Sequence, residues 1–225
     1  MKTPRNRATA IGFVAVLLWA LLALFTVGSA PTPPLLLNAI CFAIGGTLGL
    51  IWTAAVGNLV QLTRVPLRVY AFGTIGLFGY HALYFSALRL APAAEAGLIA
   101  YLWPLLIVLF SGLLPGERLR AGHLMGALLG FVGAALIISG GGAAGFDATY
   151  LPGYGLALLC ALTWSAYSVL SRRIGTAPTS SVAVFCCASA LLSAILHLLV
   201  EPTVWPGTTR AWMATIGLGL GPVGL

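Results

Sequence analysis

The 225-residue chain is 60% hydrophobic and only 7% charged, and its mean hydropathy is +1.04. Soluble domains are about 25% charged, so this composition excludes a water-soluble globular domain. The formal net charge of +7 does not indicate a nucleic-acid-binding protein, because the basic residues gather in short loops between long apolar runs.

Apolar runs of about 20 residues, the length that a helix needs to cross the hydrocarbon layer, repeat along the chain. The first run and Gly28-Ser29-Ala30 could also be read as a cleaved signal peptide, but the run is too long for one. We therefore expect an all-α polytopic membrane protein. Its seven spans and the start of an eighth are expected at residues 8–28, 34–57, 68–88, 92–114, 121–139, 152–172, 179–200 and from 210 onward.

The charged residues predict an orientation. Nine of the eleven basic residues precede the first span or lie in alternate loops. The other loops hold only Arg89 and Arg210, together with three of the four acids, Glu95, Asp147 and Glu201. An excess of Lys and Arg marks cytoplasmic loops. This pattern predicts a multi-pass protein of the bacterial inner (plasma) membrane with a cytoplasmic N-terminus.

Two pairs of short matches indicate an internal repeat. Residues 68–77 read RVYAFGTIGL and residues 210–218 read RAWMATIGL, with their shared TIGL offset by 141 residues. Trp19 in the first span and Trp164 in the sixth are offset by 145 residues. These offsets correspond to five helices, an odd number, so the second copy must enter the membrane from the opposite side. Inverted repeats of this kind are common in secondary transporters.

The repeat predicts the domain organisation. The first repeat is expected at 8–139, a Gly-rich periplasmic linker at 140–151, and an incomplete second repeat at 152–225. Two further spans would complete the second repeat. We expect that a chain ending at Leu225 transports nothing, because the mate of the fourth span would be missing.

Small residues at a spacing of four, Gly122, Gly126 and Gly130, form a stripe along the fifth span. Such stripes allow helix backbones to approach closely in lipid. We expect this face to pack on another helix, with direct substrate contact as the alternative.

Aromatic residues near mid-span are the strongest functional signal. Trp and Tyr normally lie at the membrane interface, and their buried polar atoms need partners that lipid tails cannot supply. Packing of rings between helices is the alternative for each residue, and a neutral, hydrogen-bonded core histidine is the alternative for His81. As a set, the mid-depth residues predict a substrate-binding cavity lined by Trp19, Tyr80, His81, Tyr84, Tyr101, Trp103 and Trp164.

Three further residues are expected to have structural or gating roles. Glu95 opens the fourth span, where free N–H groups favour a carboxylate, and Arg89 is near enough in sequence to pair with it. Coupling of transport is the alternative role for Glu95. Pro104 frees backbone groups within this span. Glu117 follows Pro115-Gly116 and is expected to hold that loop to basic neighbours.

The sequence lacks the catalytic motifs of the enzyme classes that could act in a membrane. No G-x-S-x-G motif, no His pair at zinc spacing and no pair of acids at one depth is present. The glycines at 140–145 are followed by no Gly-Lys-Ser/Thr and form no phosphate loop. The four cysteines have no metal-ligand spacing and are interpreted as packing residues. We expect no catalytic residue, metal or cofactor, and no nucleic-acid partner.

Four motifs in the first half carry a family resemblance: YFSAL at 84–88, APAAEA at 91–96, YLWPL at 101–105 and PGERL at 115–119. They resemble the EamA domain of the drug/metabolite transporter superfamily, and 95–119 is most similar to the YddG-type aromatic amino acid exporters. The resemblance implies two inverted five-helix repeats, ten spans of which about eight lie in this chain. It also implies a central cavity lined by helices one, three, four, six, eight and nine.

The small multidrug-resistance relatives use a mid-membrane Glu on their first helix, whereas the first span here has no acid. Proton coupling through such a carboxylate is therefore not expected. The expected function is alternating-access export of aromatic and other neutral amino acids by a monomer in the bilayer. Two alternatives remain: an exporter of other small metabolites or drugs, and a membrane scaffold that transports nothing.

Overall fold

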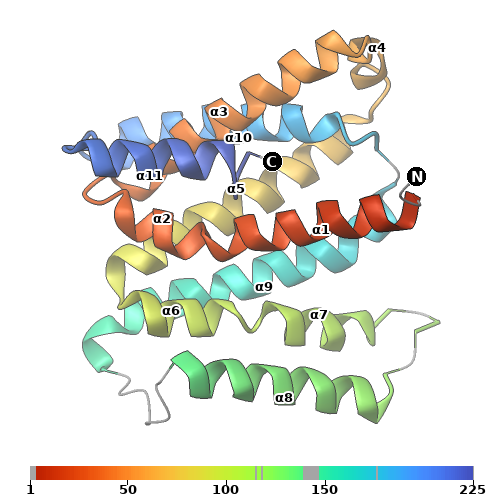
Figure 1. The fold of residues 1–225 in the computed structure, drawn as a ribbon, viewed down its shortest axis with the longest axis vertical. Helices are drawn as coiled ribbons and strands as arrows, with labels where there is room; N and C mark the ends of the chain where they lie inside the picture. Colours follow the sequence, from red (N-terminus) through yellow and green to blue (C-terminus); the bar gives the residue numbers. More distant parts are fainter. Residues whose placement is uncertain (1–3, 115, 118, 139–146, 176, 225) are drawn as a thin grey trace.

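The computed structural model describes residues 4–114, 116–117, 119–138, 147–175 and 177–224 (Figure 1). Lys2, Arg118 and residues 140–146 of the expected linker lie outside these ranges. Every element in the described part of the chain is helical: α1 Pro4–Ala20, α2 Leu22–Gly28, α3 Pro34–Ala55, α4 Leu59–Leu62, α5 Leu67–Leu90, α6 Ala93–Ala100, α7 Trp103–Ser111, α8 Ala121–Ile138, the 3₁₀-helix η1 Ala148–Tyr150, α9 Leu151–Ile174, α10 Ser181–Val200 and α11 Thr209–Leu220.

The expected spans correspond to these helices. The first span comprises α1 and α2, interrupted at Leu21, and the fourth comprises α6 and α7, interrupted at Tyr101 and Leu102. Five helical segments of the described chain are long and apolar enough to cross a membrane: 9–28, 34–55, 93–111, 148–174 and 181–200. The prediction of an all-α polytopic membrane protein is confirmed, and the count of eight spans remains a prediction.

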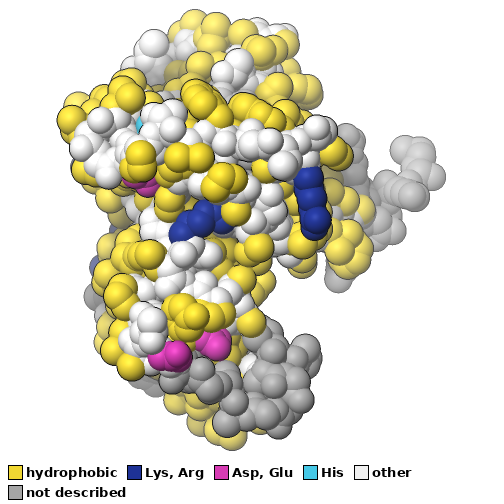
Figure 2. All heavy atoms as spheres, turned by 90° about the vertical axis from the view of Figure 1, so that its left-hand side faces the viewer, with side chains coloured by type: hydrophobic (Ala, Val, Ile, Leu, Met, Phe, Trp, Pro, Cys, Tyr) yellow, Lys and Arg dark blue, Asp and Glu magenta, His cyan; other side chains and the backbone are white. Residues whose placement is uncertain are grey.

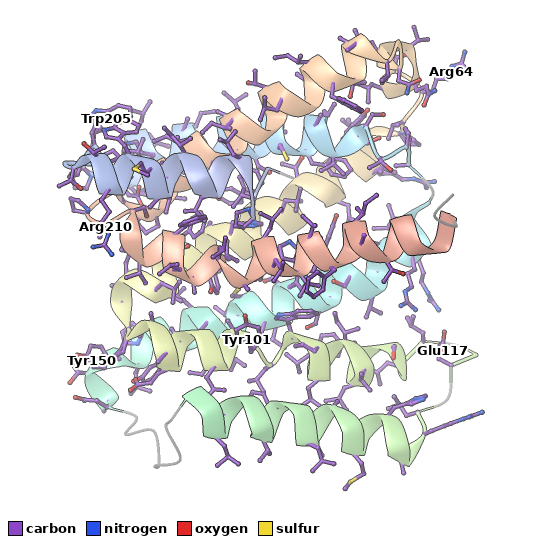
Figure 3. All side chains as sticks on the ribbon, in the orientation of Figure 1. Arg64, Tyr101, Glu117, Tyr150, Trp205 and Arg210 are labelled. Atoms are coloured by element: carbon purple, nitrogen blue, oxygen red, sulfur yellow. The ribbon has the colours of Figure 1, made fainter. Side chains whose placement is uncertain are left out.

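The long helices lie side by side, so that the bundle has two distinct ends (Figure 1). One end carries Arg64 and Glu117, and the other carries Tyr150, Trp205 and Arg210 (Figure 3). We call the first the basic end, because the loops and helix ends there carry most of the described basic side chains. The second is the acidic end, where magenta acidic side chains are visible in Figure 2.

The centre of the bundle is built from two helix pairs. The helix α3 packs along α10, and α5 packs along α9, with α10 also contacting α5. The helices α6 and α7 pack on α9, α8 packs on α7, and α11 packs on α3 and α2. This arrangement places α5 and α9, which carry four of the expected cavity residues, inside the bundle.

The α3–α10 pair is close because small residues face one another. A Cβ added at Gly46 would lie 2.6 Å from Cys187 Sγ, and one added at Gly49 would lie 2.8 Å from the Ala183 Cβ. Farther along, Asn38 Nδ2 donates a 2.9 Å hydrogen bond to Ser193 Oγ, and both side chains are fully buried. Small residues and an interhelical hydrogen bond are the means by which helices associate in lipid.

The glycine stripe on α8 does not pack as expected. A Cβ added at Gly122, Gly126 or Gly130 would meet nothing within 4 Å. The helix α8 lies at the edge of the bundle and is covered mainly by α7 (Figure 1). The stripe therefore faces away from the helices that hold α8, and the expectation of close packing is wrong for the described chain.

Candidate functional site

A break in the fourth span positions two of the expected site residues. The helix α6 ends at Ala100, and α7 begins at Trp103 with Pro104 in its first turn. Because Pro104 has no N–H, it cannot continue the hydrogen-bond ladder of α6. On α9, the fully buried Ser165 Oγ lies 3.0 Å from the Trp103 carbonyl at the break and 2.6 Å from the Ala161 carbonyl of its own helix, so its single proton is shared between them.

The break faces a group of rings between α5 and α9. The Tyr80 ring lies 4.7 Å from the Trp164 ring and 5.9 Å from the Tyr84 ring, centroid to centroid. The Tyr101 side chain at the break lies near Tyr80 and Tyr84. We call Tyr80, Tyr84, Tyr101 and Trp164 the central aromatic cluster. The structure thus brings together four of the seven residues expected to bind substrate, and Trp103 contributes its backbone beside them.

His81 lies behind this cluster and faces α3. Its ring makes edge contacts with Phe42 on α3 and with Tyr80, at 5.0 and 4.9 Å. Its Nδ1 is 2.9 Å from the Leu77 carbonyl, and the residue is only 6% exposed. In this position the His81 ring packs between α3 and Tyr80 and supports the Tyr80 ring.

Trp19 stands apart from the other site residues. It lies on α1 and is 52% exposed, and the apolar side chains around it, including Leu17 and Val16, are also exposed. The structure places it on an open face of α1, so its expected role as a cavity wall opposite Trp164 stays a prediction.

Sequence reasoning missed two rings that extend the cluster. Tyr167 on α9 lies 5.5 Å from Trp164 and stacks on Phe72 of α5 at 5.1 Å. Tyr167 follows Trp164 by three residues and Phe72 precedes Tyr80 by eight, spacings that place each pair on nearby faces of one helix. That periodicity could have identified both residues.

The expected Arg89–Glu95 pair does not form. The Arg89 guanidinium instead donates hydrogen bonds to the carbonyls of Thr26 and Thr32 and to Ser29 Oγ. Glu95 does lie in the first turn of α6, as expected, but it accepts a hydrogen bond from the Tyr154 hydroxyl of α9. Arg89 therefore holds the loop after α2 in place through hydrogen bonds. Glu95 links the first turn of α6, at the acidic end of the bundle, to α9.

Glu117 lies in the loop at the basic end (Figure 3), after Gly116, whose φ is +90°. No ion pair joins it to a described basic residue, and its neighbour Arg118 lies outside the described ranges. The expected locking of this loop therefore stays a prediction.

The chemistry available in the central aromatic cluster is that of ring faces, phenol hydroxyls and freed backbone groups. The four acids lie toward the ends of the spans or in loops. Among the described residues, no group of three His, Cys, Asp or Glu side chains could hold a metal ion. Ring faces attract both flat apolar groups and cations, so the cluster suits an aromatic or zwitterionic solute.

Comparison with known proteins identifies the family. The family model of EamA-like transporters matches residues 7–139. The aromatic amino acid exporter YddG of Ancylobacter novellus is 53% identical over 222 residues, which are 98% of this chain and 77% of that protein. The YddG protein of Escherichia coli is 28% identical over 75% of this chain and 60% of its own length.

A further relative, the pseudopaline exporter CntI of Pseudomonas aeruginosa, is 26% identical over 79% of this chain and 61% of its own length. A solved crystal structure, 53% identical, superposes with a TM-score of 0.82 over 98% of this chain and 76% of that one. The YddG and CntI relatives are named as exporters. The chain belongs to the EamA-like transporter family.

Proposed function

We propose that this protein exports aromatic amino acids across the bacterial inner membrane by alternating access. The observation that carries the proposal is the central aromatic cluster, which gathers rings from α5 and α9 at the broken fourth span. The relatives named as aromatic amino acid exporters support it. A scaffold that transports nothing would have no use for a helix break lined with phenol hydroxyls.

In this proposal the substrate ring packs between Tyr80 and Trp164, where each aromatic pair contributes about 0.5–1.5 kcal/mol. The ammonium lies over a ring face. The carboxylate accepts hydrogen bonds from the hydroxyls of Tyr84 and Tyr101. His81 acts through Tyr80, while Trp19 and Trp103 complete the walls. Pro104 keeps the span broken, and Glu95 and Glu117 hold its two ends.

Uptake of radiolabelled Phe, Tyr and Trp by liposomes containing the native protein tests the proposal, with the other seventeen amino acids as competitors. Selective uptake of the aromatic and neutral amino acids is expected. The CntI relative supports a second candidate, the export of another small metabolite. Absence of uptake of Phe, Tyr and Trp would favour that candidate.

The packing of the helices supports the proposed inverted repeat. In that repeat α9, α10 and α11 are the mates of the first, second and third spans. The α5–α9 contact then corresponds to the α11–α2 contact, and α10–α5 corresponds to α3–α11; all four contacts occur. The α3–α10 pair is its own mate and would lie on the symmetry axis.

The proposed orientation places the basic end in the cytoplasm and Asp147 outside. Asp147 is exposed, and its carboxylate accepts a 2.8 Å hydrogen bond from the Thr149 N–H, which lowers the pKa of Asp147. In a background without native cysteines, Asp147→Cys should react with an impermeant thiol reagent added outside intact cells, whereas Arg172→Cys should not. The reverse pattern would contradict the orientation. A monomer is proposed as the transporting unit.

A further inference from the structure

A ladder of rings leads from the central aromatic cluster to the basic end of the bundle. Trp164 contacts Tyr167 at 5.5 Å, and Tyr167 stacks on Phe72 at 5.1 Å with an interplanar angle of 25°. All three rings lie along the α5–α9 pair, which is antiparallel in the bundle. The ladder ends where α5 begins and α9 ends, so two helix termini meet there.

A cavity opens at this end of the ladder. One part, of about 150 Å³, is lined by Phe72, Tyr167, Ser171, Ile174 and Phe185 among others. An adjoining part, of about 370 Å³, is lined by Arg68, Phe72, Arg173 and Ile174. The two parts share Phe72 and Ile174 as lining residues, so they lie side by side. The larger part alone, of about 370 Å³, is in the range of small-molecule sites, roughly 300–1,000 Å³.

The cavity has an apolar aromatic floor and a cationic rim. Arg68 comes from the first turn of α5 and Arg173 from the last turn of α9. No carboxylate of the described residues lies within 4 Å of either guanidinium. Two unpaired guanidinium groups above a ring stack complement a ligand that has a carboxylate at one end and an aromatic ring at the other.

We propose that this cavity is a loading site, where an aromatic amino acid binds from the cytoplasm before it reaches the central aromatic cluster. Its carboxylate binds Arg68 and Arg173, and its ring packs against Phe72 and Tyr167. The ammonium lies toward the Ser171 hydroxyl and the ring faces. The inference rests on the proposed function and adds a second site to it.

The rim also gives the site a charge preference. Arg68 and Arg173 repel a cationic ligand such as a basic amino acid or an amine drug, and they attract an anionic or zwitterionic one. An anionic lipid headgroup would satisfy the rim but would leave the ring ladder without a role. The continuity of the ladder with the central aromatic cluster is therefore what favours the amino acid.

The test measures Phe uptake by membrane vesicles that expose either the cytoplasmic or the periplasmic face of the native protein. In the double variant Arg68→Gln/Arg173→Gln, KM should rise about ten-fold when Phe is presented to the cytoplasmic face, because charge-assisted hydrogen bonds are lost. KM at the periplasmic face should stay within two-fold. The matched control, Arg64→Gln/Arg172→Gln, removes the same charge from the same end without touching the cavity.

A second arm removes the carboxylate charge from the ligand. Phenylalaninamide has no carboxylate and is cationic when its amine is protonated, so its cytoplasmic KM should not rise in the Arg68→Gln/Arg173→Gln variant and should fall if the two guanidinium groups repel it. An equal rise of KM at both faces, an equal effect of the control variant, or an effect that vanishes in vesicles of zwitterionic lipid would overturn the loading site. Failure of the native protein to take up Phe at either face would instead refute the proposed function.

Discussion

The α3–α10 and α5–α9 pairs both bring two long helices into close contact, but they do so with different side chains. In α3–α10, glycines face small partners, so Gly46 lies against Cys187 and Gly49 against Ala183. In α5–α9, a glycine faces a ring instead: a Cβ added at Gly76 would lie 2.2 Å from the Tyr167 ring. The first pair brings two backbones together, whereas the second does so near its acidic end, where Gly153 lies against the Leu90 backbone, and makes room for a large ring at Gly76.

This difference indicates that α3–α10 holds the bundle together, whereas α5–α9 provides the substrate site. Close backbone contact leaves no space for a solute and holds α3 and α10 in one arrangement. Rings at centroid distances of 4.7 to 5.9 Å can exchange partners with a substrate ring at little cost, because each contact is individually weak. We therefore expect substitutions in α3–α10 to change stability, and substitutions in α5–α9 to change transport.

The largest effect is expected for Gly46→Leu. A Cβ at this position would lie 2.9 Å from the Cys187 backbone nitrogen, which cannot move without separating the two helices. Overpacking typically costs about 1–3 kcal/mol, and more where backbone must shift. Thermal unfolding in detergent should show a large loss of stability or no folded protein.

Gly122→Leu on α8 is the matched control, because an added Cβ there meets nothing within 4 Å. It should change stability by about 0.5 kcal/mol or less, as surface substitutions do. Equal losses for the two variants would show that the α3–α10 contact has no special role.

A smaller loss is expected for Ser193→Ala. This change leaves the fully buried Asn38 Nδ2 without its acceptor, and an unsatisfied buried group costs about 1–3 kcal/mol. Asn38→Leu/Ser193→Ala removes both partners and should recover most of the loss. A double variant as unstable as the sum of the two single variants would show that no interaction links them.

Ser165→Ala should have a modest effect on stability, about 0.5–1.5 kcal/mol, since it removes the hydrogen bond that Ser165 Oγ shares between the Trp103 and Ala161 carbonyls. Because this bond holds the break between α6 and α7, the variant should also reduce the rate of Phe transport. Ser189→Ala on α10, whose longer 3.5 Å bond reaches the Thr74 carbonyl, serves as control. Unchanged Phe transport in Ser165→Ala would show that this hydrogen bond at the break between α6 and α7 does not affect the substrate site.

Much of the fold could be predicted from the sequence, because a helix in lipid must be long and apolar. Pro104 predicted freed backbone groups in the fourth span, and the depth of Tyr80 and Trp164 predicted that both rings point into the bundle. Their contact could not be predicted, because apolar runs do not specify which helices pack together. The predicted Arg89–Glu95 ion pair was wrong for a related reason. Nearness in sequence did not reveal that Arg89 binds backbone carbonyls or that Glu95 accepts a hydrogen bond from the Tyr154 hydroxyl.

The central claim is that the rings between α5 and α9 bind the substrate, and Trp164→Ala tests it most directly. Phe uptake in liposomes and thermal stability in detergent are measured on the same preparation. Loss of a stacking contact of about 1 kcal/mol should weaken Phe binding roughly five-fold while the protein stays folded. A loss of about 3–5 kcal/mol of stability, as for a large core residue, with unchanged uptake per folded molecule, would contradict the account.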